Sequence, residues 1–245
     1  MRIFQIDWMR KEKDILRLNL VKVEQSLTIV EKNWKKIDDE LDLRKIGRKD
    51  TPFNADVRAK MMSAYGVLDD LLRKGVEPFS KKSIEEMCEL NNLVHYGLDS
   101  RLRQEYVKAI VANSEKYYRN IIPIIDWYEN HMKKRSHPLK VAAEVYVAIL
   151  GHPQLFIEGN HRTGSIISSW INMYYGYPPF VLSLKNAIPY FEPSAKIKKF
   201  ADKSTWRGRS RLPKYRKSFK DFWEKYADWN YVIKKSEKQI REKSA

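Results

Sequence analysis

The chain has 245 residues, of which 43% are hydrophobic and 32% are charged, and its formal net charge is +16. This composition is too apolar for a disordered protein and indicates one core domain with extensions. A single cysteine, Cys88, excludes an intrachain disulfide and a cysteine-based zinc cluster, which fits a reducing compartment. The excess of Lys and Arg predicts an anionic partner: a nucleotide, a nucleic acid, an acidic protein surface or an anionic lipid.

The sequence also bears on location. Residues 1–10 lack the apolar stretch of a signal peptide, and nowhere does the chain contain the ~18 consecutive apolar residues that could span a bilayer. We therefore expect a cytoplasmic protein without a membrane span. A bacterial effector exported by a dedicated machine fits the same sequence, because such export signals need not be hydrophobic.

The N-terminal part of the chain predicts helices. Residues 14–43 place apolar side chains about 3.6 residues apart, with charged residues between them, which indicates one long amphipathic helix. The same pattern returns at 55–72, after a break at 47–52. Ser83 and Glu86 have the spacing of a capping box, which predicts that a third helix begins there.

The rest of the chain is mostly helical by the same criteria. Pro123 marks a boundary or kink in its first helix, and Pro138 suits the first turn of the second. In chain order the pattern predicts a helix at 101–131, a helix at 138–150, a loop at 151–160, a central helix at 162–175, a short strand at 180–184 and a final helix at 219–240.

These elements predict an all-α, mostly helical fold in which a short β-hairpin is allowed. We expect an N-terminal helical extension at 1–80, a core at 81–195 and a basic C-terminal helical segment at 196–245. Between Lys196 and Lys220 eleven residues are Lys or Arg, and only Asp202 is acidic. Most of the excess positive charge therefore lies in the last segment.

The loop at 156–164 precedes the central helix and carries groups suited to phosphate chemistry. Gly159 allows a tight turn, and the unpaired N–H groups at the helix start form an anion site. Arg162 offers a planar cationic fork for phosphate oxygens, and Asn160 offers a neutral amide. Glu158 would repel a phosphate unless Mg²⁺ lay between them. The alternative is a purely structural turn in which Asn160 caps the helix and Arg162 is solvated.

The run resembles the signature of the Fic family, His-Pro-Phe-x-(Asp/Glu)-Gly-Asn-x-Arg-x-Gly. The matching residues are Phe156, Glu158, Gly159, Asn160, Arg162 and Gly164. His137-Pro138 and Ala142-Ala143 are similar to the helix that precedes the family's motif, and the run 176–179 is similar to the turn that follows the motif helix. The resemblance covers about 80 residues, roughly 100–182.

The resemblance implies a helical Fido fold that transfers AMP from ATP to a hydroxyl side chain of a target protein. It implies that Glu158 holds Mg²⁺, that Asn160 and the loop amides bind the α-phosphate, and that Arg162 binds the outer phosphates. The expected nucleotide-contacting residues are Gly159, Asn160, His161, Arg162, Thr163 and Gly164, with His161 as a contact rather than as a base.

The family's general base is the His of its His-Pro-Phe run, and here two alignments compete. Counted back strictly from Phe156, the base position is Gln154, which cannot accept a proton. If His152-Pro153 is the equivalent pair, Gln154-Leu155 is an insertion. We favour His152, because it follows the preceding helix as the family's His does. Its alternative role is to interact with the dipole at that helix end.

Two further features leave alternatives open. Ser165 stands where many family members carry another phosphate-binding Arg, which favours a nucleotide or phospho-compound other than ATP. The basic stretch at 206–217 interleaves aromatic and cationic residues, which suits nucleic acid, an acidic partner protein or simple solvation. The sequence thus allows a nucleotidyl transferase, a non-catalytic relative that binds a nucleotide or phospho-ligand, or a binder of anionic macromolecules through the basic segment.

Overall fold

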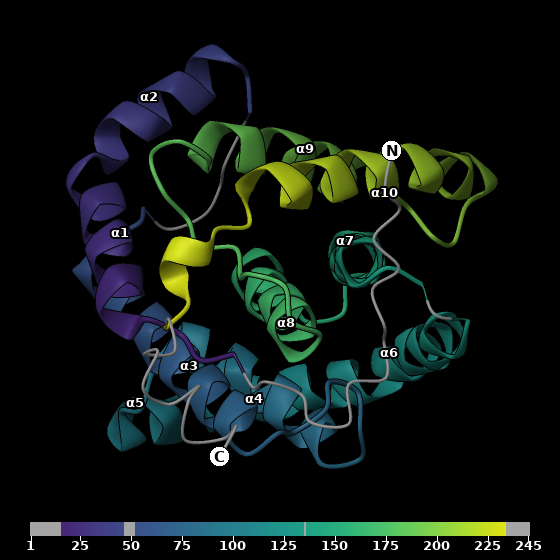
Figure 1. Cartoon of the computed structure of the whole chain (residues 1–245), viewed down its shortest axis with the longest axis horizontal. Coiled ribbons are helices and arrows are strands. Elements are labelled where there is room, and N and C mark those ends of the chain that lie inside the picture. Colours follow the sequence, from purple (N-terminus) through teal and green to yellow (C-terminus); the bar gives the residue numbers. More distant parts are fainter. Residues whose placement is uncertain (1–15, 47–51, 135, 234–245) are drawn as a thin grey trace, which may run out of the picture.

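The computed structural model describes residues 16–46, 52–134 and 136–233. Within these ranges the chain forms ten α-helices and one short 3-10 helix, η1, without any β-strand (Figure 1). The all-α class predicted from the sequence is therefore confirmed. The elements are α1 (Leu20–Lys32), α2 (Trp34–Leu43), α3 (Ala55–Arg73), α4 (Ser83–Tyr96), α5 (Ser100–Glu105), α6 (Val107–Lys133), α7 (Pro138–Leu150), α8 (Asn160–Tyr174), α9 (Ala187–Phe200), α10 (Trp206–Tyr226) and η1 (Trp229–Tyr231).

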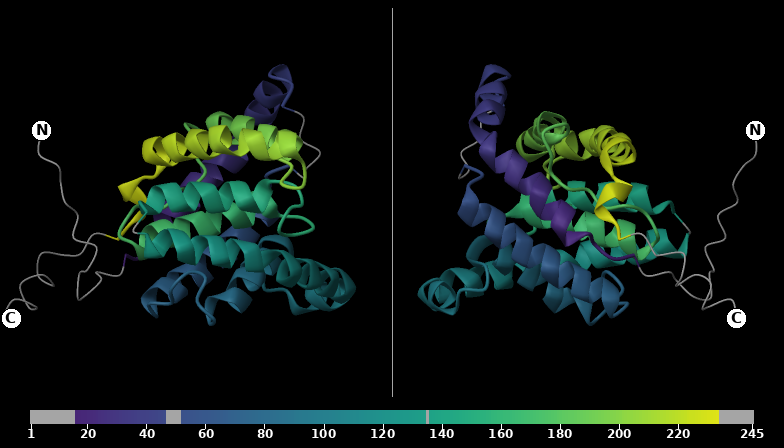
Figure 2. Two further views of the ribbon diagram at one scale, coloured as in Figure 1. Left: turned by 90° about the vertical axis from the view of Figure 1, so that its right-hand side faces the viewer. Right: turned by 60° about the vertical axis from the view of Figure 1, so that its left-hand side comes forward.

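Helix α8 is the centre of the molecule. It packs on α7, α4 and α3, while α7 is covered in turn by α10, α9 and α6. Figures 1 and 2 show α9 and α10 on one side of the α7–α8 pair, with α3 and α4 on the other. Nearly every side chain of α8 is buried, as its apolar sequence predicts. The loop that carries the motif therefore enters directly into the core of the protein.

Two expected long helices are each divided. Asn33 separates α1 from α2, and its side-chain amide donates to the carbonyl of Ile29 at 2.8 Å, which competes with continued helix formation. Tyr106 separates α5 from α6. Pro123 lies inside α6 and does not end it. The helices expected at 55–72, 138–150 and 162–175 match α3, α7 and α8 within two residues at each end.

The capping box expected at Ser83 does not form. Lys82 is the residue that caps α4, without a side-chain hydrogen bond, and the Ser83 hydroxyl donates instead to the carbonyl of Ser80 at 2.9 Å. The preceding turn has already bent the chain back toward Ser83, so its hydroxyl is used there. The start of α4 was located correctly, and the reason given for it was wrong.

The short strand expected at 180–184 is also wrong, and no β-hairpin forms in the described residues. The backbone N–H and C=O of Phe180 both bond to the hydroxyl of Ser169 on α8 at 3.1 Å. The carbonyl of Leu182 accepts from Ser26 of α1 at 2.9 Å. Side chains of neighbouring helices thus satisfy this extended backbone, which leaves no need for a partner strand.

The last helix differs from its predicted limits. α10 begins at Trp206 rather than at residue 219, contains Pro213 and ends at Tyr226. Residues 234–240 of the predicted helix lie outside the described ranges. One face of α10 buries Tyr215, Phe219 and Trp223 against the core, so this part of the basic segment is an amphipathic helix. The domain limits at 80/81 and 195/196 stay a prediction.

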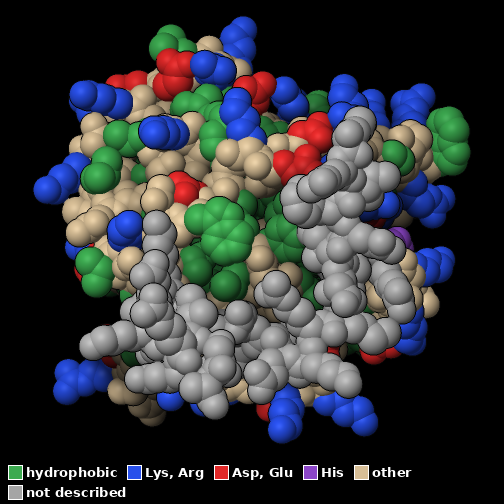
Figure 3. Space-filling view, in the orientation of Figure 1, with side chains coloured by type: hydrophobic (Ala, Val, Ile, Leu, Met, Phe, Trp, Pro, Cys, Tyr) green, Lys and Arg blue, Asp and Glu red, His purple; other side chains and the backbone are tan. Residues whose placement is uncertain are grey.

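Charged side chains lie around the rim of the face shown in Figure 3, and hydrophobic side chains lie nearer the middle. Lys and Arg gather at the upper right, where Figure 1 shows α10. None of the helices in the described ranges is long and apolar enough to cross a bilayer.

Candidate functional site

Phe156 fixes the motif loop in the core. Its side chain is fully buried and stacks on Tyr117 of α6, with ring centroids 5.1 Å apart and planes 6° from parallel. The hydroxyl of Tyr117 donates to the carbonyl of Ile84 at 2.7 Å, so the ring below Phe156 is itself held in place. Because a buried aromatic residue dominates local packing, Phe156 sets the register of the loop on both sides.

Two buried asparagines support the backbone after Phe156. The amide of Asn91 on α4 donates to the Glu158 carbonyl at 3.1 Å and to the Thr163 hydroxyl at 2.8 Å. Asn113 on α6 donates to the Asn91 side-chain oxygen and accepts from the Ile157 N–H, at 2.8 and 2.9 Å. A continuous hydrogen-bonded chain therefore connects α4, α6 and the loop. Such networks hold a site rigid only when each member is satisfied.

The same face of α6 continues this support. Lys116 donates to the Phe156 carbonyl at 2.9 Å, and Asn120 donates to the Gln154 carbonyl at 3.3 Å. Together with Asn113 these residues lie three to four positions apart, which places them in one row along the helix. Burial lowers the pKa of the Lys116 amine. The row bonds to the loop backbone at three places, the Ile157 N–H and the Phe156 and Gln154 carbonyls, and so fixes the path of the backbone.

Asn160 closes the loop on itself. Its side-chain oxygen accepts from the Phe156 N–H at 2.9 Å, and its side-chain nitrogen donates to the Phe156 carbonyl at 3.0 Å. The same nitrogen lies 3.5 Å from the Gln154 side-chain oxygen. Asn160 is buried, and its first role in this structure is to hold the turn.

Gly159 is required by the close approach of α4. Its φ is 70°, and a Cβ atom at this position would lie 2.3 Å from Nε2 of His95 and 2.9 Å from Nδ2 of Asn91. Only glycine fits both the left-handed backbone and this space. Gly159 is also the N-cap of α8 and offers no capping side chain, so the first N–H groups of the helix have no partner within the helix.

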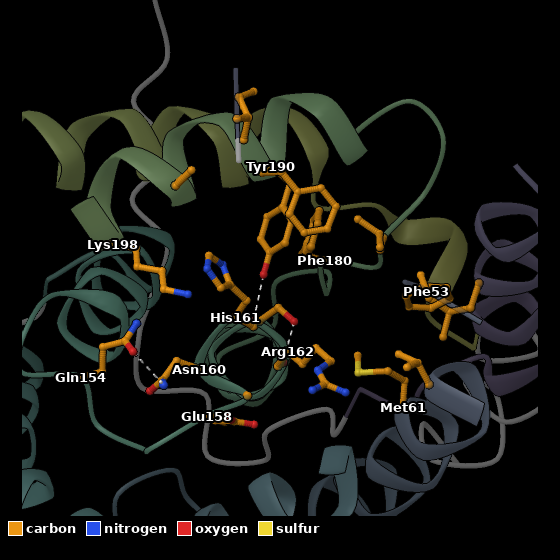
Figure 4. A pocket seen from close by; sticks show the side chains of 18 of the residues that line it. Phe53, Met61, Gln154, Glu158, Asn160, His161, Arg162, Phe180, Tyr190 and Lys198 are labelled. Atoms are coloured by element: carbon orange, nitrogen blue, oxygen red, sulfur yellow. Dashed lines mark hydrogen bonds between the residues drawn. The ribbon is translucent and has the colours of Figure 1, made fainter. Parts of the chain in front are cut away.

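A pocket of about 410 Å³ opens at this helix start (Figure 4). Its polar end is formed by Gln154, Glu158, His161 and Arg162, together with Lys198 from α9. The opposite end is apolar and aromatic. That end includes Leu27, Ile46, Phe53, Val57, Met61, Tyr65, Phe180, Leu182, Tyr190 and Phe191.

Arg162 and His161 are positioned from two sides of α8. The Arg162 guanidinium donates from Nη1 to the Val94 carbonyl at 2.7 Å, and Figure 4 shows it directed toward the Met61 side of the pocket. The Tyr190 hydroxyl donates to the His161 carbonyl at 2.8 Å, and the His161 ring lies 3.4 Å from the Tyr146 hydroxyl. Both side chains line the pocket, and their contact with a ligand stays a prediction.

Thr163 and Gly164 do not line the pocket. Thr163 is fully buried, where its hydroxyl accepts from Asn91 and its N–H donates to the Gly159 carbonyl at 2.9 Å. A Cβ atom on Gly164 would lie 3.1 Å from the Tyr146 ring, so this glycine permits α8 to pack on α7. In the structure both residues support the loop from the core side.

His152 and Gln154 lie in different surroundings. His152 is exposed, does not line the pocket, and pairs through its backbone with the chain after α9: its N–H donates to the Ala201 carbonyl at 2.7 Å, and its carbonyl accepts from Lys203 at 2.6 Å. Gln154 lines the pocket next to Asn160 (Figure 4). The geometry therefore brings Gln154, and not His152, to the other motif residues.

The histidine buried beside the loop is neutral, so it adds no charge to those of Glu158 and Arg162. Burial, and next the positive charge of Arg162, lower the pKa of His95 to about 4, so this histidine is neutral at physiological pH. The neutral imidazole of His95 can pack against Gly159 without adding a positive charge to that of Arg162. Arg162 is thus the permanent cation of the loop, beside the positive end of the α8 dipole.

Glu158 is the one carboxylate among the described residues that line the pocket, and it is exposed. The described residues contain no group of three or more His, Cys, Asp or Glu side chains that could hold a metal by themselves. A single carboxylate fits Mg²⁺, which is commonly held by one or two carboxylates and by the phosphates of a substrate. It does not fit an ion bound by protein groups alone.

Comparison with known proteins finds two partial relatives. The chain is 28% identical over 117 residues to the protein adenylyltransferase fic-1 of Caenorhabditis elegans, and 26% identical over 117 residues to the protein of the same name from Caenorhabditis briggsae. Each match covers 44% of this chain and 23% of the relative, so the chain spans about a quarter of the length of these relatives. No family model and no solved structure matches the chain. Part of this chain is therefore similar to proteins named as adenylyltransferases.

Proposed function

We propose that the chain binds the phosphates of a nucleotide at the start of α8 and transfers AMP from ATP to a hydroxyl side chain of a target protein. The observation that carries this proposal is the pocket in which Glu158, Arg162 and the first amides of α8 meet. The similarity to adenylyltransferases supports the choice of reaction.

The pocket suggests how a nucleotide lies. The apolar end, with Phe180 and Tyr190 stacked 5.0 Å apart, suits a purine ring, while the polar end suits phosphates. The N–H groups at the start of α8 and the guanidinium of Arg162 bind phosphate oxygens. Asn160 holds the turn that aims these amides, which is a positioning role.

Glu158 is the residue of this chain that would hold Mg²⁺. The ion would neutralise the phosphates and stabilise charge that develops on them during transfer. The exposed position of Glu158 beside the anion site agrees with this role. The protein groups otherwise act by orientation and charge, as is usual in phosphoryl chemistry.

The step of AMP transfer that the motif supports least is removal of the proton from the target hydroxyl. A general base must reach that proton, and an amide such as Gln154 cannot accept it. His152, which we favoured on sequence grounds, lies outside the pocket. We therefore expect slow transfer by the natural chain, because a positioned base contributes about 10²- to 10⁴-fold in rate.

The first experiment is calorimetric titration of ATP with Mg²⁺ into the full chain. The matched variants are Arg162→Ala in the pocket and Arg119→Ala on the exposed side of α6. We expect binding to the wild type and to Arg119→Ala, and loss of at least about 10-fold in affinity for Arg162→Ala. Absence of binding to the wild type would overturn the proposal.

The second experiment tests transfer. Protein extracts incubated with the chain and with ATP labelled at the α-phosphate would show which proteins receive AMP. We expect Gln154→His to raise labelling by about 10²-fold, because it places an imidazole beside Asn160 that can act as a base. We expect Glu158→Ala to abolish labelling, because it removes the carboxylate that would hold Mg²⁺.

A non-catalytic nucleotide-binding protein is the second candidate, and the position of Gln154 in the pocket favours it. It predicts that the natural chain binds ATP and labels no protein. Labelling by the wild type would exclude it. Gain of labelling in Gln154→His alone would show that the chain retains every other requirement for transfer.

A further inference from the structure

Lys198 of α9 brings a second cation to the pocket, from outside the motif. Among the described residues that line the pocket, the cationic side chains are Arg162 and Lys198, and the acidic one is Glu158. Figure 4 shows the Lys198 amine pointing into the pocket on the side of Gln154 and His161, whereas Arg162 points toward Met61. The two cations thus face the start of α8 from different sides.

The surface of α9 explains why Lys198 and not its neighbours reaches the pocket. Phe191, Ala195 and Lys198 all line it, at spacings of four and three residues that place them on one face of the helix. Lys196 is paired with Glu192 at 2.8 Å, and Lys199 lies over the ring of Phe200 at 5.2 Å. Among the carboxylates of the described residues, none forms an ion pair with Lys198.

The charge of a nucleotide makes this amine useful. The formal charges of Arg162 and Glu158 sum to zero. Without a further cation, only the helix amides and a bound divalent ion would balance the negative charge of a triphosphate. Ser165, one turn into α8, lines the pocket with a short neutral side chain whose hydroxyl donates to the Arg162 carbonyl at 2.8 Å. It therefore adds no positive charge where the outer phosphates would lie.

We infer that Lys198 binds an outer phosphate oxygen of the nucleotide through its ammonium group. Lys198, from α9, thus provides a positive charge that the neutral Ser165 on α8 does not. This inference rests on the proposed nucleotide site and assigns to it a triphosphate or diphosphate rather than a monophosphate. A flexible ammonium on an exposed helix can reach the ligand as a point charge and needs no bidentate geometry.

The test compares three lysine variants of the full chain by calorimetric titration, with ATP plus Mg²⁺ and with AMP as ligands. Lys198→Gln removes the amine, Lys198→Arg keeps a cation, and Lys199→Gln removes the same charge one residue away. We expect Lys198→Gln to weaken ATP binding about 10-fold and AMP binding less than about 2-fold. Lys198→Arg and Lys199→Gln should stay within about 3-fold of the wild type for both ligands.

The outcomes separate this inference from the proposed site. If Arg162→Ala loses ATP while Lys198→Gln binds as the wild type does, the site is right and the role of Lys198 is wrong. Equal losses in Lys198→Gln and Lys199→Gln would show a general effect of net charge, and equal losses of ATP and AMP would place the amine away from the outer phosphates. Either result overturns the inference. A wild type that binds no nucleotide overturns both proposals.

Discussion

The two ends of the segment 152–162 are held in different ways. At the first end, His152 is exposed and fixed only through its backbone, to Ala201 and Lys203. At the second end, the backbones of Phe156, Ile157 and Glu158 are hydrogen-bonded to the side chains of Lys116, Asn113 and Asn91, respectively, which come from α6 and α4. The first end is therefore tolerant of side-chain change, whereas the second is held in one conformation.

The difference shows where precision is needed. The proposed phosphate site would require backbone N–H groups within about 0.5 Å of the productive position, and α4 and α6 hold the loop backbone with buried polar side chains. Before Phe156 the support is uneven, because the His152 side chain is exposed whereas Leu155 is buried. Substitutions should therefore have large effects at Phe156 and Gly159 and a small effect at His152.

The largest expected effect is that of Phe156→Ala. The side chain is fully buried and stacked on Tyr117, so its removal should lower the free energy of unfolding by about 4 kcal/mol. Ile157→Ala is the control one residue away, because Ile157 is 48% exposed and should cost below about 1 kcal/mol. Urea unfolding of both variants measures this. Similar losses would mean that Phe156 does not anchor the loop.

The pH dependence of stability should show the second effect. His95 has a pKa of about 4 in the folded chain and an ordinary value of 6.5 when unfolded. The unfolded chain therefore takes up the proton first, and stability present above pH 6.5 is lost as the pH falls toward 4, by at most about 3 kcal/mol. The charges facing His95 are those of Arg162 and Lys60, and both oppose its protonation.

Urea unfolding between pH 7 and pH 4.5 measures this loss. His95→Gln should be less pH-dependent than the wild type by most of the expected amount, since the variant has no imidazole to protonate under Gly159. His131→Gln, in the last turn of α6, is the matched variant in which a histidine away from the loop is replaced. Identical slopes for the wild type and His95→Gln would show that His95 is not buried against the loop.

A smaller effect is expected at Gly159, where a matched glycine exists. Gly159 and Gly176 both have positive φ, 70° and 83°, but only at Gly159 would a Cβ atom meet other atoms, His95 and Asn91. Gly159→Ala should therefore cost about 2 kcal/mol more than Gly176→Ala, in which only backbone strain acts. It should also weaken ATP binding, because the amides at the start of α8 shift. Equal costs in thermal unfolding would mean that α4 does not approach the loop closely.

The sequence predicted the part of the fold that local pattern determines. Helix α7 follows from Pro138 and Gly151 at its two ends, and α8 follows from an apolar run stopped at Gly176. The division of the first helix at Asn33 was missed, because one asparagine hardly changes a periodic pattern. The strand expected at 180–184 was wrong for a related reason: Ser169 and Ser26, remote in sequence, bond to that backbone.

For the site, too, the sequence does not reveal contacts between residues that are remote along the chain. The residues within the loop could be named from their chemistry, and Glu158, Gly159, Asn160, His161 and Arg162 do lie together at the pocket. Asn91 and Asn113 could not, because a lone asparagine in a helix carries no signal until its distant partner is known. Their spacing to the loop, 67 and 44 residues, exists only in the folded chain. Lys198 could not be told apart from the neighbouring Lys196 and Lys199, because the sequence alone does not show which of them faces the pocket.

The smallest expected effect is that of His152→Ala, and it decides between the two alignments of the motif. The side chain is exposed and outside the pocket, and the backbone bonds to Ala201 and Lys203 persist in the variant. Stability should change by less than about 0.5 kcal/mol, and ATP affinity should stay within about 2-fold of the wild type.

Gln154→Ala is the comparison, because it removes the side chain that lies beside Asn160 inside the pocket. It should change ATP affinity more than His152→Ala does. If instead His152→Ala abolished AMP transfer while ATP binding was kept, His152 would have to reach the pocket when the target binds. The pair His152-Pro153 would then be the true counterpart of the family's base, with Gln154-Leu155 inserted, and the loop before Phe156 would have to move during the reaction.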